Sequence, residues 1–257
     1  MGGKVIFFDI DGTLLDHNNR LPESTKHSIG KLHRAGHVVA IATARPPFRF
    51  GNIAQELGVR SYVSMNGQYV TVDGEVIFRA PLEREKVSSL KKFADARRHP
   101  LVFADPVNTT ASIADHDDIA ACFAGLNETM PQYDPDYDMN REIYQCIVFC
   151  KEAAEGDYRT VFPDLHFVRW HDLAMDAIPA GLSKAFGIQK WIERMGVNRE
   201  DVYAFGDSYN DIEMLEFAGC GIAMGNAPDA VKRAAKLVTK AVNEDGIFHG
   251  LQMAGLI

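Results

Sequence analysis

The chain has 257 residues, of which 46% are hydrophobic and 24% are charged, so it is long enough to bury one large core or two smaller ones. Its 35 acidic and 27 basic side chains give a formal net charge of −8. An acidic surface disfavours non-specific binding to nucleic acid or to anionic lipid, because basic patches supply most of that attraction. The sequence also holds no apolar run of the roughly 18 residues that a membrane-spanning helix needs.

The first residues reach Asp9 after only a short apolar stretch, which is too short and too soon acidic for a signal peptide. The four cysteines, Cys122, Cys146, Cys150 and Cys220, form no CxxC pair. Cys146 and Cys150 lie in an apolar run typical of a strand, so we expect buried free thiols rather than metal ligands or a disulfide. These features favour an enzyme of the cytoplasm.

Strand and helix signals alternate in the first part of the chain. The predicted elements are strands at residues 4–8, 37–42 and 61–65 and helices at 22–35 and 47–57. Continuous apolar strands separated by helices indicate a parallel sheet covered on both faces. Residues 68–79 then predict a hairpin whose tight turn is Asp73-Gly74.

The pattern changes after residue 80. The predicted elements there are helices at 83–98, 116–126 and 153–162, strands at 101–104, 109–113, 142–150, 165–170 and 174–178, and a loop at 130–139. The alternation of helices and strands resumes from residue 182, with strands at 202–205, 220–224 and 236–239. We therefore predict an α/β fold, in which residues 1–80 and 180–257 form a Rossmann-like three-layer core with a parallel sheet and residues 81–179 form an inserted α+β domain.

Two acids follow the first predicted strand, in the sequence DIDGTLLD at residues 9–16. The strand would deliver Asp9 and Asp11 to its carboxyl end, where open α/β sheets bind their ligands; Gly12 permits a tight turn there, and Thr13 can hydrogen-bond locally. An Asx turn would explain one of these acids but not both. Neighbouring carboxylates raise each other's pKa unless a cation compensates, so we predict a divalent metal site, with Mg²⁺ as the expected ion.

A second acidic segment, GDSYND at residues 206–211, follows the predicted strand at 202–205. Asp207 lies just after its strand, as Asp9 does after the first strand. We expect Asp207 to complete the metal site. Asp211 comes four residues later, at the start of the next helix, where it is expected to cap or to orient.

Two further candidates lie at the ends of elements. Thr43 ends the second strand, where its hydroxyl could hold a phosphoryl oxygen, and Arg45 nearby is interpreted as a solvated or substrate-side cation. Lys184 opens the helix after the insertion, where a positive charge opposes the helix dipole, so neutralisation of phosphoryl charge would explain its position. Taken singly, a Thr at a strand end is common, and Lys184 would be an ordinary surface lysine.

In this order, the four segments resemble the motifs of the haloacid dehalogenase superfamily, in its Cof-like, sugar-phosphatase-like branch. DIDGTLLD is similar to the first motif, Thr43 to the second, Lys184 to the third and GDSYND to the fourth, although the usual Gly after that lysine is Ala185 here. The position and length of the insertion resemble a C2-type cap. Residues 66–67 and 225–227 extend the resemblance to nearly the whole chain.

The resemblance implies a phosphatase that acts on phosphate monoesters of small metabolites, namely sugar phosphates and in some members FMN or pyridoxal phosphate. It implies that Asp9 attacks phosphorus and forms an aspartyl-phosphate, and that Asp11 acts as acid and then as base. It also implies that Mg²⁺ is bound by Asp9, by Asp207 and by the backbone carbonyl of Asp11. The implied phosphate-binding residues are Thr43, Ala44, Lys184 and Asn210, and Asp211 is implied to orient Lys184 or the metal shell. The cap would close over the site and determine specificity.

Two other functions stay open. A phosphomutase or phosphotransferase would pass the same intermediate to a sugar hydroxyl, and a receiver-type signalling module would also use acids, a Thr and a Lys around Mg²⁺. Asp11 disfavours the signalling module, because an acid/base residue promotes turnover, and so does an insertion of about 100 residues, the size of a whole domain. The expected partner is a small phosphorylated metabolite rather than nucleic acid or membrane; a monomer is the default, with a dimer left open.

Overall fold

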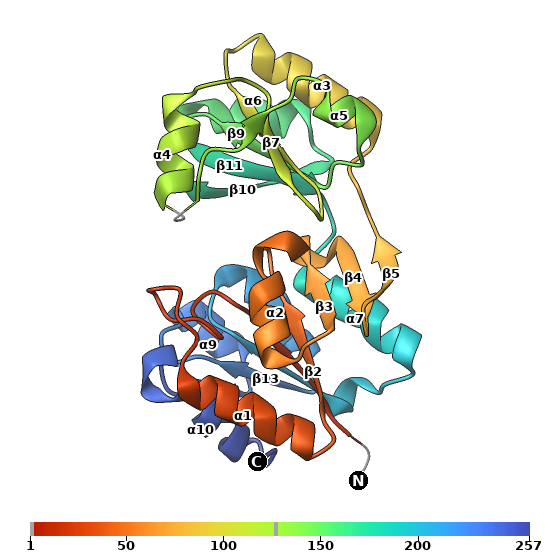
Figure 1. Ribbon diagram of the computed structural model, residues 1–257, viewed down its shortest axis with the longest axis vertical. Coiled ribbons are helices and arrows are strands. Elements are labelled where there is room, and N and C mark those ends of the chain that lie inside the picture. The colour runs from red at the N-terminus through yellow and green to blue at the C-terminus, as the bar shows by residue number, and fades with distance from the viewer. Residues whose placement is uncertain (1–2, 126–127) are drawn as a thin grey trace. The chain divides into compact units, whose positions relative to one another are not determined.

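The computed structural model describes residues 3–125 and 128–257, and the chain divides into two compact units (Figure 1). The core unit comprises Met1–Arg79 and Leu182–Ile257, and the inserted unit comprises Ala80–Gly181. Among the helices of the described residues, we find none with the length and apolar character needed to cross a membrane.

A sheet of eight strands forms the centre of the core unit, in the order β14-β13-β12-β1-β2-β3-β4-β5. The strands are β1 (Val5–Phe8), β2 (Val38–Ala42), β3 (Ser61–Ser64), β4 (Tyr69–Val72), β5 (Glu75–Arg79), β12 (Val202–Gly206), β13 (Cys220–Ala223) and β14 (Leu237–Val238). Those from β14 to β3 are parallel, and β4 and β5 add the predicted antiparallel hairpin at one edge. Because β1 lies between β12 and β2, the loops that follow these three strands are neighbours.

Helices cover both faces of this sheet (Figure 1). On one face pack α1 (Glu23–Arg34), α2 (Gly51–Leu57) and α10 (Gly246–Met253), and on the other α7 (Lys184–Met195), α8 (Ile212–Phe217) and α9 (Asp229–Ala234). In β1, Ile6 and Phe8 join the first of these cores and Val5 and Phe7 the second, because alternate residues of a strand point to opposite faces. The α/β class and the three layers predicted from such continuous apolar strands are confirmed.

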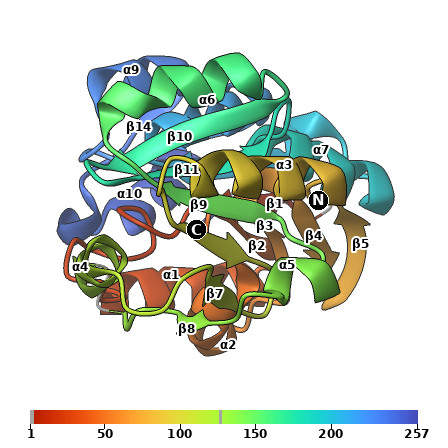
Figure 2. The same cartoon turned by 90° about the horizontal axis from the view of Figure 1, so that it is seen from above.

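The inserted unit is built on a mainly antiparallel sheet in the order β10-β11-β9-β6-β7-β8. Its strands are β6 (Leu101–Ala104), β7 (Thr109–Ala111), β8 (Gln132–Tyr133), β9 (Gln145–Phe149), β10 (Leu165–His171) and β11 (Ala174–Pro179). On one face pack α3 (Arg84–Asp95), α5 (Tyr137–Asn140) and α6 (Glu155–Val161), and on the other α4 (Asp117–Gly125) (Figure 2).

The loop predicted at residues 130–139 is wrong, since this segment contains β8 and α5. Tyr137 is buried there in the core of the inserted unit, and its hydroxyl donates a hydrogen bond to Oδ2 of Asp105 at 2.8 Å. That partner lies 32 residues earlier in the chain, so no local pattern could reveal it.

Other differences concern the ends of elements. The strand predicted at 142–150 is the shorter β9, and the helix predicted at 116–126 is α4, with Leu126 outside the described residues. The C-terminal helix α10 was not predicted, although Ile247 and Leu251 contribute to the core. Cys146 and Cys150 are buried free thiols, as predicted, and Cys122 and Cys220 are free as well.

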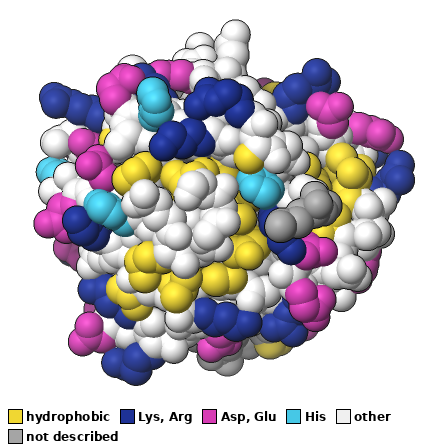
Figure 3. Space-filling model, turned by 90° about the horizontal axis from the view of Figure 1, so that it is seen from below, with side chains coloured by type: hydrophobic (Ala, Val, Ile, Leu, Met, Phe, Trp, Pro, Cys, Tyr) yellow, Lys and Arg dark blue, Asp and Glu magenta, His cyan; other side chains and the backbone are white. Residues whose placement is uncertain are grey.

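Figure 3 shows the core unit from the end at which the chain's C-terminus lies in Figure 1. Lys and Arg side chains alternate there with Asp and Glu, and hydrophobic side chains gather between them.

Candidate active site

Asp9 lies directly after β1, at the carboxyl edge of the core sheet. Its backbone N–H donates to the carbonyl of Phe205 in β12 at 3.0 Å, which places the loop after β1 beside the loop after β12. The side chain of Asp9 is buried, with the residue only 4% exposed. A carboxylate at this depth is costly unless a cation compensates it.

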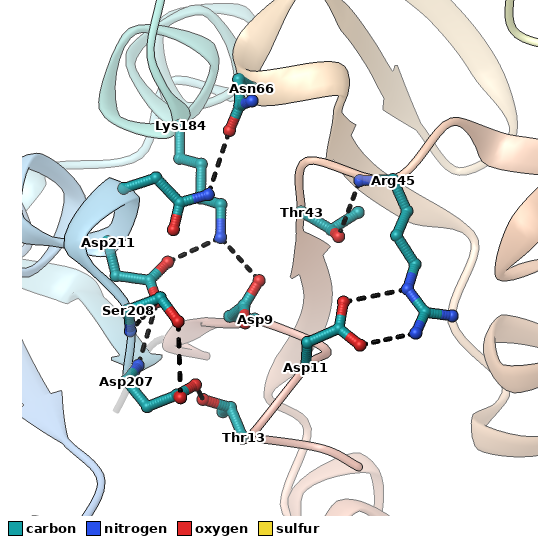
Figure 4. Close-up of polar contacts among 11 residues, drawn as sticks. Asp9, Asp11, Thr13, Thr43, Arg45, Asn66, Lys184, Asp207, Ser208 and Asp211 are labelled. Atoms are coloured by element: carbon teal, nitrogen blue, oxygen red, sulfur yellow. Dashed lines mark hydrogen bonds and ion pairs between the residues drawn. The ribbon is translucent and has the colours of Figure 1, made fainter. Parts of the chain in front are cut away.

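Lys184 supplies one such cation. Its Nζ lies 2.6 Å from Oδ1 of Asp9 and 2.6 Å from Oδ1 of Asp211 (Figure 4). Lys184 is 1% exposed, so the alternative of an ordinary surface lysine is wrong. Burial by itself would lower the pKa of Lys184, but the Asp211 and Asp9 carboxylates outweigh this effect and raise it. The ammonium group therefore stays charged between two buried acids.

Two glycines allow α7 to bring Lys184 this close. A Cβ on Gly67, which has a φ of +92°, would lie 2.1 Å from the carbonyl oxygen of Ser183, and a Cβ on Gly187 would lie 2.3 Å from Cγ1 of Val63. Ser183 caps α7 by accepting a hydrogen bond from the backbone N–H of Phe186 at 3.3 Å. The helix thus starts against the loop after β3, with Lys184 as its first residue.

Asp211 uses both of its carboxylate oxygens within the protein. Oδ1 accepts from Lys184, and Oδ2 accepts the backbone N–H groups of Asp207 and Ser208, both at 2.9 Å. Asp211 is fully buried. It therefore caps the turn after β12 and also holds Lys184.

Asp207 accepts a hydrogen bond from the Thr13 hydroxyl at 2.8 Å, over a separation of 194 residues (Figure 4). The sequence-based interpretation, which gave Thr13 only a local hydrogen bond, is corrected by this contact. Burial raises the pKa of Asp207 to about 6; the Thr13 hydrogen bond opposes this rise, and the charge of Asp211 adds to it.

Carboxylate oxygens of Asp9, Asp207 and Asp211 lie within 4.8 Å of one another. Burial raises the pKa of Asp9, Lys184 opposes this rise, and the Asp211 and Asp207 charges add to it, so a cation bound here would favour the ionised form of Asp9. Because Asp211 is occupied by Lys184 and the backbone, Asp9 and Asp207 are the carboxylates available to a further cation. Hard oxygen donors of this kind fit Mg²⁺.

Asp11 forms an ion pair with Arg45 rather than with Lys184. Its carboxylate forms a two-point ion pair with Arg45, with Nε 2.9 Å from Oδ2 and Nη2 2.5 Å from Oδ1 (Figure 4). The interpretation of Arg45 as a solvated or substrate-side cation did not foresee this pair, because 34 residues separate its members.

The remaining predicted phosphate-binding residues lie around the same edge. The Thr43 hydroxyl accepts the backbone N–H of Arg45 at 3.1 Å, and Ala44 between them is half-buried. Nδ2 of Asn210 donates to Oδ1 of Asn66 at 3.2 Å, a partner to which sequence reasoning gave no role. The structure thus brings Asp9, Lys184, Asp207 and Asp211 together, whereas Asp11, Thr43 and Asn210 contact other groups.

Comparison with known proteins agrees with this geometry. The family model for haloacid dehalogenase-like hydrolases matches residues 6–251. The chain belongs to this family. It is 43% identical over 257 residues to the Bacillus subtilis protein YkrA, which is provisionally named a phosphatase, with all of each chain covered. It is 30% identical over 267 residues to the pyridoxal phosphate phosphatase YbhA of Escherichia coli, with 96% of this chain and 97% of the relative covered.

A solved structure of the same family is also similar. The subclass IIB sugar phosphatase BT4131 superimposes with a TM-score of 0.86 at 31% identity, over 99% of this chain and 100% of the other. Together with the family match, these relatives make the chain a phosphatase of the haloacid dehalogenase-like hydrolase family.

The raised pKa of Asp207 leads to an expected result for metal-free protein. Between about pH 4, near the ordinary pKa of Asp in an unfolded chain, and about pH 6, the unfolded chain has lost this proton while the folded chain still holds it. Ionisation of Asp207 therefore opposes folding as the pH rises, and Asp207→Asn should gain in Tm over the wild type across this interval. Thermal denaturation in EDTA measures the difference, and a gap that does not change with pH would contradict this reading.

Proposed function

We propose that the chain is a Mg²⁺-dependent phosphatase that hydrolyses phosphate monoesters of small metabolites through an aspartyl-phosphate on Asp9. The observation that carries this proposal is the buried group in which Lys184 joins Asp9 to Asp211 at 2.6 Å from each, with Asp207 beside them. This arrangement supplies a carboxylate nucleophile, a cation and ligands for a metal within one small volume.

In this mechanism an oxygen of Asp9 forms a bond to phosphorus while the bond from phosphorus to the leaving oxygen breaks. For the first step Asp11 must leave its ion pair with Arg45 and carry a proton, which it gives to that oxygen; in the second step it takes a proton from the water that attacks the aspartyl-phosphate. Phosphate leaves and Asp9 is regenerated. Lys184, Thr43, the backbone at Ala44 and Asn210 bind the phosphoryl oxygens, and Asp211 keeps Lys184 in place.

Asp9, Asp207 and the backbone carbonyl of Asp11 would hold Mg²⁺. When bound, the ion neutralises charge on the acids and on the phosphoryl group, so that an anionic nucleophile can approach an anionic ester.

We further propose that residues 81–179 act as a C2-type cap that determines which leaving group is accepted. Support comes from their forming a compact unit with its own core, inserted between Thr43 and Lys184. Sugar phosphates, FMN and pyridoxal phosphate are the candidate substrates, in line with the names of BT4131 and YbhA.

The test is phosphate release from a panel of sugar phosphates, FMN, pyridoxal phosphate and p-nitrophenyl phosphate. We expect many turnovers with Mg²⁺ and almost none in EDTA, because the charges of Asp9 and Asp207 would then repel the phosphate. The rank order within the panel would identify the substrate class.

The same assay separates the alternatives. An isomerised sugar phosphate in place of free phosphate would indicate a phosphomutase, and release of a single equivalent would indicate a signalling module. A folded protein that turns over no member of the panel would contradict the proposal.

A further inference from the structure

Asn226 links three loops at the carboxyl edge of the core sheet. Its Nδ2 donates to the backbone carbonyl of Gly12 at 2.9 Å and reaches Oδ2 of Asp207 at 3.4 Å, and its Oδ1 accepts the backbone N–H of Val242 at 3.0 Å. These partners lie after β1, β12 and β14, respectively. The proposed mechanism gives this side chain no role.

The carboxylate of Asp207 is oriented by neutral donors. The Thr13 hydroxyl donates to Oδ1 at 2.8 Å, and the Asn226 amide lies 3.4 Å from Oδ2. A Cβ on Gly12 would lie only 2.2 Å from Oδ2, so the turn after β1 packs directly on this oxygen. Neutral donors fix the direction of a carboxylate but leave its negative charge in place for a cation.

The turn after β1 is held from two sides. The backbone N–H of Gly12, which shares a peptide plane with the carbonyl of Asp11, donates to the carbonyl of Leu15 at 3.0 Å. On the other side of Gly12, its carbonyl accepts the Asn226 amide. Asn226 therefore acts on the direction of the Asp207 carboxylate and on the Gly12–Thr13 peptide unit, which adjoins the unit that carries the Asp11 carbonyl.

We propose that Asn226 is a positioning residue for the divalent metal site, which keeps Asp207 and the Asp11 carbonyl in a geometry ready for the ion. The inference rests on the proposed function, in which these two groups are ligands. Groups that orient metal ligands without touching the metal commonly change its affinity by about 10- to 100-fold when they are removed.

The test is the affinity for Mn²⁺, which accepts the same oxygen ligands as Mg²⁺, measured by EPR of the free ion without substrate. Asn226→Ala should raise the Kd by about 10-fold or more. The matched control is Glu244→Ala. It loosens the same C-terminal loop, because Oε2 of Glu244 accepts the backbone N–H of Ala241 at 3.3 Å, but its carboxylate bonds to neither Asp207 nor Gly12. This control should leave the Kd close to that of the wild type.

The outcomes are distinct. A weaker Mn²⁺ affinity in Asn226→Ala alone supports the positioning role, whereas an unchanged Kd, or an equal rise in both variants, overturns it and leaves the proposed function standing. A wild-type protein that binds no Mn²⁺ overturns both. Should Asn226→Ala fail to fold in EDTA, Asn226→Gln replaces it, since this variant keeps the amide but moves it away from Asp207 and should also raise the Kd.

Discussion

Replacing Asp9 by Asn is expected to lower phosphate release by about 10⁴-fold or more, the scale of loss when a covalent nucleophile is removed. The Asn side chain has nearly the same shape as that of Asp but carries no charged oxygen that can attack phosphorus. Lys184 keeps its contact with Asp211 in this variant, so the fold should persist. Initial rates with Mg²⁺ measure the effect, and thermal denaturation in EDTA confirms that the protein is folded.

The matched control for this experiment is Asp16→Asn, at the other end of the same sequence motif. Oδ1 of Asp16 accepts the backbone N–H groups of Asn18 and Arg20 at 2.8 and 2.9 Å, which an Asn oxygen can also do. We expect its rate to stay within about twofold of the wild type, because the substitution keeps these two hydrogen bonds. A rate for Asp9→Asn similar to that of this control would exclude Asp9 as the nucleophile.

Replacing Lys184 by Met is expected to destabilise the metal-free protein by about 3–5 kcal/mol, because it leaves buried carboxylates without their cation. The side chains of Lys184, Asp9 and Asp211 are 1%, 6% and 0% exposed, so water cannot take over the role of the ammonium group. Phosphate release should fall as well, since Lys184 also binds phosphoryl oxygens in the proposed mechanism. Chemical denaturation in EDTA gives the free energy of unfolding.

Lys190→Met in the same helix is the control for this substitution. Lys190 pairs with Glu193 at 3.0 Å on the surface, and exposed ion pairs of this kind contribute only about 0–1 kcal/mol. Equal destabilisation by both substitutions would show that the buried ion pairs contribute little.

The loss of stability in Lys184→Met should shrink toward lower pH. The pKa of Asp9 is raised, and its protonation removes one of the two buried carboxylate charges that Lys184 neutralises.

The sequence predicted those features that depend on neighbouring residues. The run VIFF predicts a strand buried on both faces, and Asp73-Gly74 predicts the tight turn between β4 and β5; both follow from side-chain periodicity and local backbone geometry. The same local reasoning located Asp9 and Asp207 at the ends of strands, because a polar residue directly after an apolar run marks the edge of a sheet. It failed at residues 130–139, where a distant partner of Tyr137 decides the conformation.

Only the tertiary structure decided which of these residues meet. The strand order places β12 on one side of β1 and β2 on the other, so Asp207 and Thr43 lie on either side of Asp9, although they are far from it in the sequence. Lys184 reaches Asp9 across 175 residues, and Thr13 reaches Asp207 across 194. No local pattern encodes such pairs, because each depends on how separate strands and helices pack, and the burial that raises the pKa of Asp9 and of Asp207 arises only when they do.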